Sequence, residues 1–557
     1  MLAKELTAML TKKLTFLFCC LIGCGFVAAT PPNDSLLLRD YRFTKQADPW
    51  LTSRNAAGLV RFACENMAEA ELSLTREKGS LTNFDGSPDV WQADAAIESF
   101  YRFSQRTVLY GSMSYQSFTG KDMGGSAFTP HTAHRPFDIV EDSLTNHGEK
   151  HMDTYHLVGG AACSVTDDIV VGLRLDYTAA NYAKYKDLRH QNKLMDLRAT
   201  TGITYQPWQW LMVGADYQYH RNVESITFGT FGTSDKVYKS LIDYACFMGH
   251  VEQFGSEGYT DKSREMPLVN DYHGGSLQLG LHFDEHTQLF NELSYAHQRG
   301  YYGRKSPYTI TYSEHQSDNY QYSARISCRE NRSMYLVDFT MNLENLENKA
   351  NTYREAKNAS QATYYEYFTP VKTANKLWAD YSLTYTLHLG MRGATVAHGL
   401  IVDGLPTWTI QAGVHWMNRK QTAYAYPYYH QQDLHSNELF GSLTYRLPCR
   451  HGLWSFAANA SFLQGEGDPV EELTYQMPSD KQPVPATMQA YLYREYQYLT
   501  AAQYAVGGQL KYAIIFPGSA IKTYARLSAT HRKANQTYAY SQGCDHWTVT
   551  LAIGCSF

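Results

Sequence analysis

The chain has 557 residues, of which 44% are hydrophobic, 14% are aromatic and 18% are charged, with a formal net charge of −5 at pH 7. This length exceeds one ordinary soluble core, so two or more domains or one large barrel are expected. The charge argues against a nucleic-acid partner, and a mean hydropathy of −0.43 argues against a bundle of membrane helices.

Residues 1–29 have the organisation of a signal peptide. A lysine pair precedes the apolar stretch 14–27, and small residues at 27–29 provide a cleavage site after Ala29. A second interpretation stays open, because Leu21-Ile22-Gly23-Cys24 matches a lipoprotein cleavage box that would leave Cys24 lipidated. Cleavage after Ala29 is favoured, since a chain that spans a membrane needs no lipid anchor.

Residues 30–62 show no strand periodicity. They contain Trp50 and the run Asn55-Ala56-Ala57-Gly58-Leu59. Their tryptophan and leucine content argues against a frayed tail. We therefore expect a segment that lies on the periplasmic side of the next domain or folds into it as a plug.

From Met67 onward, apolar side chains alternate with small or polar ones. Clear examples are 276–283, 377–389, 408–416 and 503–516. In the final run, Asp545 to Phe557, the odd-numbered residues from 547 on are apolar and the even-numbered ones are small or polar. Successive strand side chains point to opposite faces. A dozen or more such runs predict that residues 63–557 form an all-β, transmembrane antiparallel β-barrel.

The connections support this prediction, because tight turns alternate with long polar loops, as in barrels with short periplasmic turns and long extracellular loops. About 18 strands are expected, and 16 is the alternative because the runs at 67–78, 95–103 and 286–296 are weak. The connection near 390–405 is assigned to the periplasmic side. The tight turns are at 104–107, 166–168, 206–209, 284–286, 330–333, 449–452 and 517–520, and the long loops at 121–150, 223–273, 353–375, 464–495 and 532–544.

Eleven charged residues fall on the expected inner face. On the lipid face a charge would cost about 2–4 kcal/mol at the bilayer midplane. Pairing that only hydrates the lumen is favoured over a selective substrate path, and both stay open. The residues are Arg174, Asp176, Asp196, Arg198, Asp216, Arg325, Asp338, Asp380, Arg446, Lys511 and Arg526.

No cofactor, metal site or catalytic residue is predicted. His131, His134, His147 and His151 lie among carboxylates, but their spacing matches no tight ligand motif. The chain has no Gly-x-Ser-x-Gly elbow and no His-Glu-x-x-His motif, and His415 has no evident serine partner. The enzyme hypothesis is therefore the weakest.

Two further residue classes leave alternatives open. Tyrosine clusters at 364–368 and 424–429 suit an interfacial girdle, which is favoured, or the stacking of a flat ligand such as a sugar. Seven cysteines follow the signal peptide without a Cys-x-x-Cys pair. Only Cys246 and Cys544 fall in long outer loops, where either a disulfide or two free thiols is consistent with the sequence.

The signal peptide, the segment from Asp48-Pro49-Trp50 to Leu59, the tyrosine-rich hairpins and the terminal Phe557 resemble an uncharacterised family of large outer-membrane barrels from Gram-negative gut anaerobes. The Asn-Ala-Ala-Gly-Leu run is also distantly similar to fatty-acid-transporter-type barrels, where an N-terminal hatch enters the lumen. This chain lacks their Asn-Pro-Ala form and has more expected strands, so that family's hydrophobic substrates are not carried over.

These observations favour a protein of the cell outer membrane that acts as a channel or as a ligand-capturing transport subunit gated by loops 223–273 and 464–495. One alternative is a scaffold or assembly partner for surface lipoproteins, and a second is an outer-membrane hydrolase. The expected partners are outer-membrane lipids, the barrel assembly machinery with Phe557 as the assembly signal, and a surface lipoprotein or a TonB-dependent receptor. No nucleic acid is expected.

Overall fold

The computed structural model describes residues 39–556, apart from 65, 132–133, 142–146, 232–236, 255–265, 392–394, 398–399, 450–451, 517–520, 538 and 541–542. The predicted signal peptide 1–29, residues 30–38 of the predicted N-terminal segment and the predicted assembly signal Phe557 lie outside these described residues.

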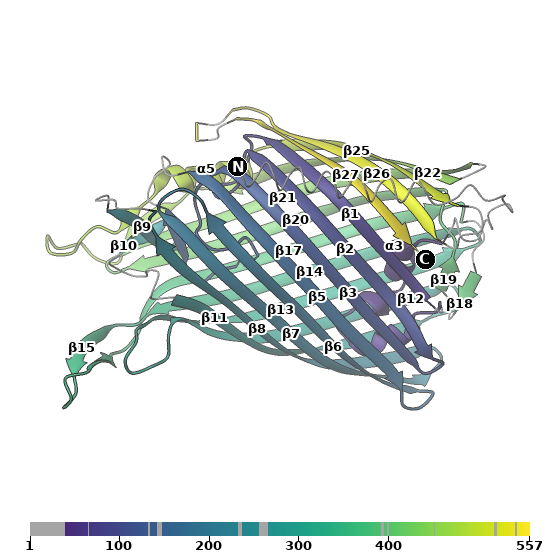
Figure 1. Cartoon of the computed structure of the whole chain (residues 1–557), viewed down its shortest axis with the longest axis horizontal. Helices are drawn as coiled ribbons and strands as arrows, with labels where there is room; N and C mark the ends of the chain where they lie inside the picture. The colour runs from purple at the N-terminus through teal and green to yellow at the C-terminus, as the bar shows by residue number, and fades with distance from the viewer. Residues whose placement is uncertain are drawn as a thin grey trace.

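Eighteen antiparallel strands form a closed barrel (Figure 1). The first strand pairs with the last, with Leu74 opposite Leu551 and Ser73 opposite Ala552. The prediction of about 18 strands is confirmed, and the alternative of 16 is wrong. The strands are β1 (Asn66–Gly79), β2 (Asp89–Ser104), β3 (Thr107–Met123), β5 (Gly148–Ser164), β6 (Ile169–Lys184), β7 (Arg189–Trp208), β8 (Leu211–Gly229), β11 (Met266–His282), β12 (Thr287–Gly303), β13 (Thr311–Glu330), β14 (Ser333–Ala350), β17 (Val371–Leu389), β20 (Trp408–Ala425), β21 (Tyr428–Cys449), β22 (Gly452–Gly467), β25 (Gln503–Ile515), β26 (Lys522–Ala534) and β27 (Asp545–Ser556).

The three weak runs form β1, β2 and β12. In β1, Leu72 and Leu74 point outward and are exposed, whereas Glu69 is buried against the N-terminal segment. Charged residues on the inner face lower the average hydropathy of the run without changing its period of two. The strand is therefore amphipathic in the way that a barrel requires.

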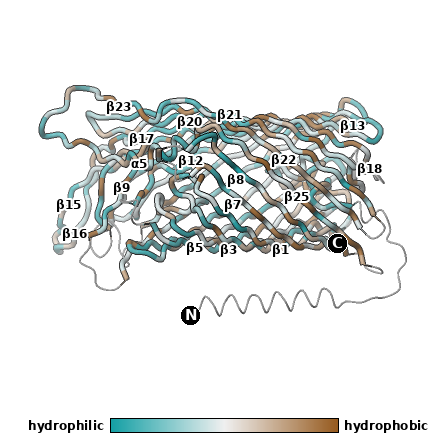
Figure 2. The backbone as a smooth tube through the Cα atoms, turned by 90° about the horizontal axis from the view of Figure 1, so that it is seen from above, coloured by the Kyte–Doolittle hydropathy of each residue, from teal (hydrophilic) through white to brown (hydrophobic). Residues whose placement is uncertain are grey.

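The outer face of the barrel is apolar, and Figure 2 shows hydrophobic segments along the strands. On β6, Val171, Leu173 and Leu175 are 42%, 53% and 49% exposed, while Gly172 faces inward. A belt of exposed aliphatic side chains of this extent is unfavourable in water and matches a hydrocarbon environment. Among the described residues, no helix combines the length and hydropathy needed to cross a bilayer.

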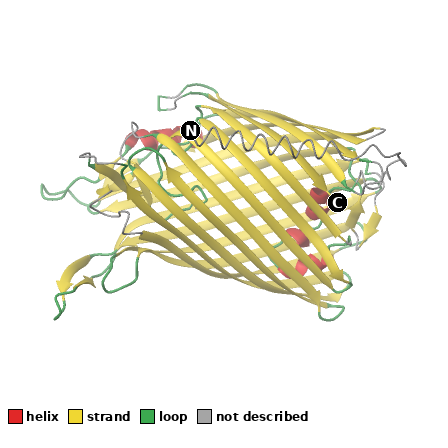
Figure 3. Ribbon diagram, viewed as in Figure 1, coloured by secondary structure: helices red, strands yellow, loops and turns green. Residues whose placement is uncertain are grey.

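The two ends of the barrel differ (Figure 3). At the turn end, most strands are joined by short turns, and β17 and β20 are joined through β18 (Thr395–Ala397) and β19 (Leu400–Asp403). At the loop end, β15 (Tyr353–Lys357) and β16 (Thr363–Tyr367) form a projecting hairpin, and β23 (Glu471–Thr474) extends the pairing of β21. β4 (Asp138–Glu141), β9 (Tyr238–Ala245), β10 (Met248–Phe254) and β24 (Ala486–Thr487) form a separate sheet, accompanied by helix α5 (Gln489–Thr500).

Several strands are longer than the sequence pattern indicates. β8 and β11 pair from Ile226–Met266 to Leu211–Leu281, so both strands extend into the predicted loop 223–273. The turn predicted at 206–209 begins later, because β7 continues to Trp208. Beyond the apolar belt the outward residues become polar, so the hydropathy signal fades although the backbone pairing continues.

The N-terminal segment lies inside the barrel at the turn end, as three short helices. α3 (Tyr41–Ala47), α4 (Pro49–Thr52) and η1 (Ala56–Arg61) each begin after a residue whose side chain accepts a hydrogen bond from a backbone N–H in the first turn. These capping residues are Asp40, Asp48 and Asn55. We call residues 40–62 the lumenal segment.

Cys246 and Cys544 are both free cysteines, so the disulfide alternative for this pair is not realised. Cys246 is buried between β9 and β10, where its Sγ lies 3.9 Å from the carbonyl oxygen of Gln421 on β20. It therefore packs inside the barrel mouth rather than in an outer loop.

Candidate functional site

The lumenal segment rests on a row of glycines that crosses five neighbouring strands, β5, β6, β7, β8 and β11. A Cβ atom at Gly172 would overlap the backbone of Ala56 and Ala57, and one at Gly280 would lie 3.0 Å from the Trp50 ring. The inner wall is thus smooth where the segment approaches it most closely. We call this row the glycine seat; it consists of Gly160, Gly172, Gly202, Gly214 and Gly280.

Asn55 fixes the segment on the seat. Its Oδ1 accepts a hydrogen bond from Ala57 N (3.0 Å) and thereby caps η1. Its Nδ2 lies within donor distance of the carbonyl oxygens of Ile203 (3.0 Å) and Ala215 (3.2 Å) and of Gln278 Oε1 (3.0 Å). A buried side chain that serves both the segment and three wall oxygens sets the position of η1 along the strands.

Arg54 provides a second polar attachment to the same wall. Its backbone N donates to Glu292 Oε1 (3.1 Å), and its Nη1 donates to Gln218 Oε1 (3.0 Å). Its Nη2 also donates to Gln321. Together with Asn55, this residue connects the segment to the strands from β7 to β13.

Ion pairs hold the first helix of the segment, and an apolar contact holds the end of the segment. Arg42 in α3 pairs with Glu69 (2.7 Å) and Glu71 (3.0 Å) on β1. After η1, the Phe62 ring stacks on Phe100 of β2 with a centroid distance of 4.5 Å. Because Phe62 and Phe100 are each 1% exposed, this contact excludes water at the base of the segment.

A cavity of about 650 Å³ lies on the side of the lumen away from the glycine seat, between α3 and strands β13 to β26. Two carboxylates, Asp40 and Asp338, face it. Neutral polar groups such as Gln411 and Gln509 complete the polar part of the wall. The cationic side chains of the cavity outnumber its carboxylates. The cations are Arg42, Arg325, Arg446, Lys511, Lys522 and Arg526.

Asp40 faces the cations of this cavity. Lys511 Nζ lies 3.9 Å from its Oδ2. Burial acts to raise the pKa of Asp40, but the charges of Lys522 and Lys511 and the hydrogen bond from Phe43 N outweigh it and lower the pKa to about 2. Asp40 is therefore ionised near neutral pH, and the lumenal segment supplies the counter-ion for this part of the wall.

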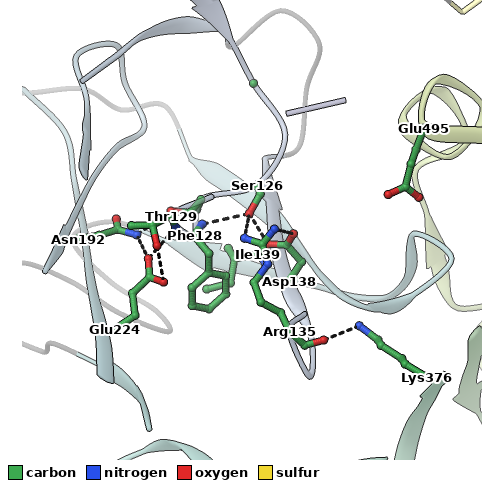
Figure 4. A network of polar contacts seen from close by, with 12 residues as sticks. Ser126, Phe128, Thr129, Arg135, Asp138, Ile139, Asn192, Glu224, Lys376 and Glu495 are labelled. Carbon is green, nitrogen blue, oxygen red and sulfur yellow. Dashed lines mark hydrogen bonds and ion pairs between the residues drawn. The ribbon is translucent and has the colours of Figure 1, made fainter. Parts of the chain in front are cut away.

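The loop end contains a second set of buried polar contacts, which Figure 4 shows from close by. Lys376 on β17 donates from Nζ to the carbonyl oxygen of Arg135 (2.9 Å). Ser126 Oγ donates to Asp138 Oδ1 (2.7 Å), and Thr129 N donates to Glu224 Oε1 on β8 (2.7 Å). These residues are at most 9% exposed, so the inward-folded loops are anchored to the wall.

The eleven charged residues expected on the inner face fall into two groups. Five line the cavity: Arg325, Asp338, Arg446, Lys511 and Arg526. The other six do not line it: Arg174, Asp176, Asp196, Arg198, Asp216 and Asp380.

Asp216 and Asp196 lie near the glycine seat and the loop end, respectively. Asp216 accepts from Gln278 Nε2 (2.7 Å), next to Asn55. Asp196 accepts from His220 Nε2 (3.0 Å) and lies 3.6 Å from His131, with Arg198 two positions further along the same face of β7.

The remaining three form local pairs. Arg174 lies 3.4 Å from Asp176, which also contacts His156 (2.7 Å), and Asp380 lies 3.4 Å from His415 Nε2. No serine is among the described hydrogen-bond partners of His415. Such local pairs match the interpretation in which lumenal charges pair with one another.

The four histidines of region 131–151 are not gathered at one point. His134 stacks on Trp378 and pairs with Glu344, His147 lies 3.6 Å from Asp122, and His151 contacts Asp153. Among the described residues, no group of three or more potential ligands could hold a metal ion.

The aromatic clusters lie at the loop end. Tyr365 and Tyr367 belong to the projecting β15–β16 hairpin, where Tyr365 packs edge-on against Tyr353 at 5.6 Å. Tyr429 stacks on Tyr475 of the following loop at 4.5 Å. Each ring contacts other tyrosines of the loops, which leaves both the girdle and the ligand-stacking interpretations as hypotheses.

Comparisons with known proteins give one family and several distant structures. No curated protein matches the sequence. Among solved structures, the chain is similar to the outer membrane transporter YddB from Escherichia coli (9% identity, TM-score 0.40, 89% of this chain and 81% of that chain). It is also similar to BauA, the ferric preacinetobactin receptor from Acinetobacter baumannii (9%, 0.34, 88% and 80%), and to a mutant of the TodX monoaromatic hydrocarbon channel (10%, 0.30, 90% and 92%).

These TM-scores are low, and the likeness implies nothing about the substrate of this chain. The sequence itself gives the clearer result. A model described as a family of unknown function, DUF6850, matches residues 56–557, which comprise η1 of the lumenal segment and the whole barrel. The chain therefore belongs to the DUF6850 family.

Proposed function

We propose that this protein is an outer-membrane transport barrel with a gated lumen, in which the lumenal segment is the gate. The apolar outer belt supports a place in a bilayer, and the short turns support a periplasmic position for the turn end. On this orientation, the segment occupies the periplasmic side of the lumen, and the inward-folded loops cover only part of the outer side.

The observation that carries the proposal is the fit between the lumenal segment and the glycine seat. A barrel of about 16–18 strands encloses a water-filled channel unless something occupies it. Here five glycines leave room for one segment, while Asn55 and Arg54 hold it by hydrogen bonds. Contacts of this polar kind can be exchanged for water when the segment moves, which suits a gate better than a permanent core.

The test is single-channel conductance of the purified protein in planar bilayers. The unmodified protein is expected to be silent. Gly172→Val, which collides with Ala56 and Ala57, is expected to produce conductance steps by displacing the segment. Gly159→Val is the matched control on the neighbouring strand, because a Cβ at Gly159 has no atom within 4 Å. Deletion of residues 39–62 should open the barrel further.

Two results would contradict the proposal. A large steady conductance of the unmodified protein would make it an open diffusion channel. Silence of both Gly172→Val and the deletion, with the segment of Gly172→Val accessible to protease, would count against transport. In that case the scaffold alternative, with the projecting β15–β16 hairpin as the surface for a lipoprotein partner, would replace it.

A further inference from the structure

We propose that the cavity beside α3 binds a small hydroxylated organic anion whose phosphate or carboxylate group is held by Arg446, Lys511 and Lys522. This site names the substrate class for the gated barrel, so its role in transport rests on the proposed function. Binding itself does not depend on transport and is measured separately.

Three cations of the cavity wall face the carboxylate of Asp40. Arg446 on β21 donates to Pro406 O (3.1 Å) and Thr409 Oγ1 (2.9 Å), both uncharged. Lys511 on β25 lies 3.9 Å from Asp40 Oδ2 and 3.9 Å from the centroid of the Tyr524 ring. Lys522 on β26 donates to the carbonyl oxygen of Arg39. Asp40 thus faces an excess of positive charge.

The other cations of the cavity are paired with carboxylates. Arg325 pairs with Asp338 (2.5 Å). Arg42 and Arg526 both contact Glu71, at 3.0 Å and 2.6 Å. The excess positive charge is therefore confined to one part of the wall, formed by β21, β25 and β26.

Because these side chains are partly buried, the excess positive charge favours the binding of an anion. The side chains of Lys511 and Asp40 are only 19% and 18% exposed. A cation that is shielded from water and lacks a full counter-charge is unfavourable. A bound anion would form charge-assisted hydrogen bonds with it, and little water would have to be removed from the cation first. An anion at this position would supply the charge that Asp40 alone does not.

The remainder of the cavity suits a hydroxylated body. Its volume of about 650 Å³ is in the range of small-molecule sites. Gln411, Gln509 and Ser455 offer uncharged donors and acceptors along the wall, and Phe43 adds an apolar surface. This combination fits a sugar phosphate or a sugar acid better than an apolar solute.

Binding is tested by isothermal titration calorimetry of the full chain in detergent at pH 7. The probes are glucose 6-phosphate, gluconate and glucose, which share a six-carbon body and differ in charge. Saturable binding of at least one anion, weakened by added salt, is expected, with none for glucose. The stronger of the two anions identifies the group that the site prefers.

Two variants act in opposite directions. Lys511→Gln is expected to weaken anion binding by about tenfold, the effect of one charge contact in a partly solvated site. Asp40→Asn is expected to strengthen binding by a similar factor, because it removes the competing carboxylate and an asparagine still caps α3. Lys420→Gln, at an ion pair with Asp433 outside the cavity, is the matched control and should change nothing.

The site is overturned if neither anion binds saturably, if glucose binds equally well, or if Asp40→Asn weakens binding as Lys511→Gln does. The last result would mean that both residues act only by holding the segment in place. Anion binding by a barrel that never conducts would overturn the transport function and keep the site. Conductance by Gly172→Val, together with no anion binding by the unmodified protein, would overturn the site and keep the transport function.

Discussion

Asp40 shows how a single residue of the lumenal segment connects local structure to the barrel. Its carboxylate caps α3 through Phe43 N (3.0 Å) and faces Lys511 and Lys522 on the wall. Because its pKa in the folded protein is lowered from 3.8 to about 2, the ionised carboxylate stabilises the docked segment above the ordinary pKa. That contribution, about 2 kcal/mol, is lost as the pH falls through the folded-state pKa.

We therefore expect α3 to loosen on acidification. Amide hydrogen exchange of residues 41–47, corrected for intrinsic rates, should accelerate between pH 5 and pH 2. Asp40→Asn should exchange faster at pH 5 and respond less to acid, because the titrating group is gone. An equal acid response in the variant and the unmodified protein would assign the effect to Glu69 or Glu98, which also contact α3.

The alternation of strand side chains was the basis on which the sequence assigned charged residues to the inner face. The structure brings Arg325, Asp338, Arg446, Lys511 and Arg526 to one cavity. Lys522 and Asp40 were missed, because Lys522 lies at the start of its strand and Asp40 lies outside the barrel strands. The glycine seat was missed as well: single glycines at inward positions look like ordinary small residues until their strands are placed side by side.

Helix α5 is an element that the sequence pattern did not reveal, and a buried ion pair attaches it to the barrel. Its glutamate Glu495 pairs with Arg419 on β20, and the side chains are 9% and 12% exposed. Removing one partner of a buried pair typically costs about 3–5 kcal/mol, because the other charge stays buried. This ion pair therefore holds α5 against the barrel mouth.

Glu495→Gln is expected to accelerate amide exchange in residues 489–500 while the barrel strands stay protected. Glu472→Gln, on the exposed strand β23, is the matched control and should leave α5 unchanged. Equal protection of α5 in both variants would mean that apolar contacts, such as those of Tyr491 and Leu492 with Phe84 and Phe247, hold the helix alone.

The sequence did not predict α5, and the physical reason is local. Its N-cap residue, Met488, makes no side-chain capping bond, and its first turn carries no acidic residue. The stretch 464–495 is polar on average, so it has the composition of a solvated loop. The helix is stabilised by Arg419 of the barrel wall and by an apolar cluster that includes Phe84, Val140 and Phe247 of the loops. No pattern within the segment contains that information.

At the scale of the whole molecule, the strand count and the two different ends followed from the sequence, because a bilayer imposes the same period of two on every strand. The inward folding of segments at both ends did not follow from it. The loops and the N-terminal segment fold inward through contacts with residues more than a hundred positions away, such as Arg54 with Gln218 and Lys376 with Arg135. Local periodicity cannot encode such contacts.

The outer belt gives the prediction that tests membrane placement. Leu175 on β6 is 49% exposed and points outward between Leu173 and Tyr177. In a bilayer, an arginine near the midplane of the lipid face costs about 2–4 kcal/mol. The same strand carries Arg174 on its inner face without this cost, since that side chain contacts Asp176 (3.4 Å).

Leu175→Arg is therefore expected to lower the free energy of unfolding in phospholipid vesicles by about 2–4 kcal/mol, measured by denaturant titration of the refolded barrel. Leu175→Ala separates the charge from the lost volume and should cost less, because it keeps the face apolar. If the belt faced water instead, the arginine would be hydrated, and Leu175→Arg would be as stable as Leu175→Ala or more so. That result would exclude a lipid-facing position for β6 and, with it, a membrane-spanning barrel.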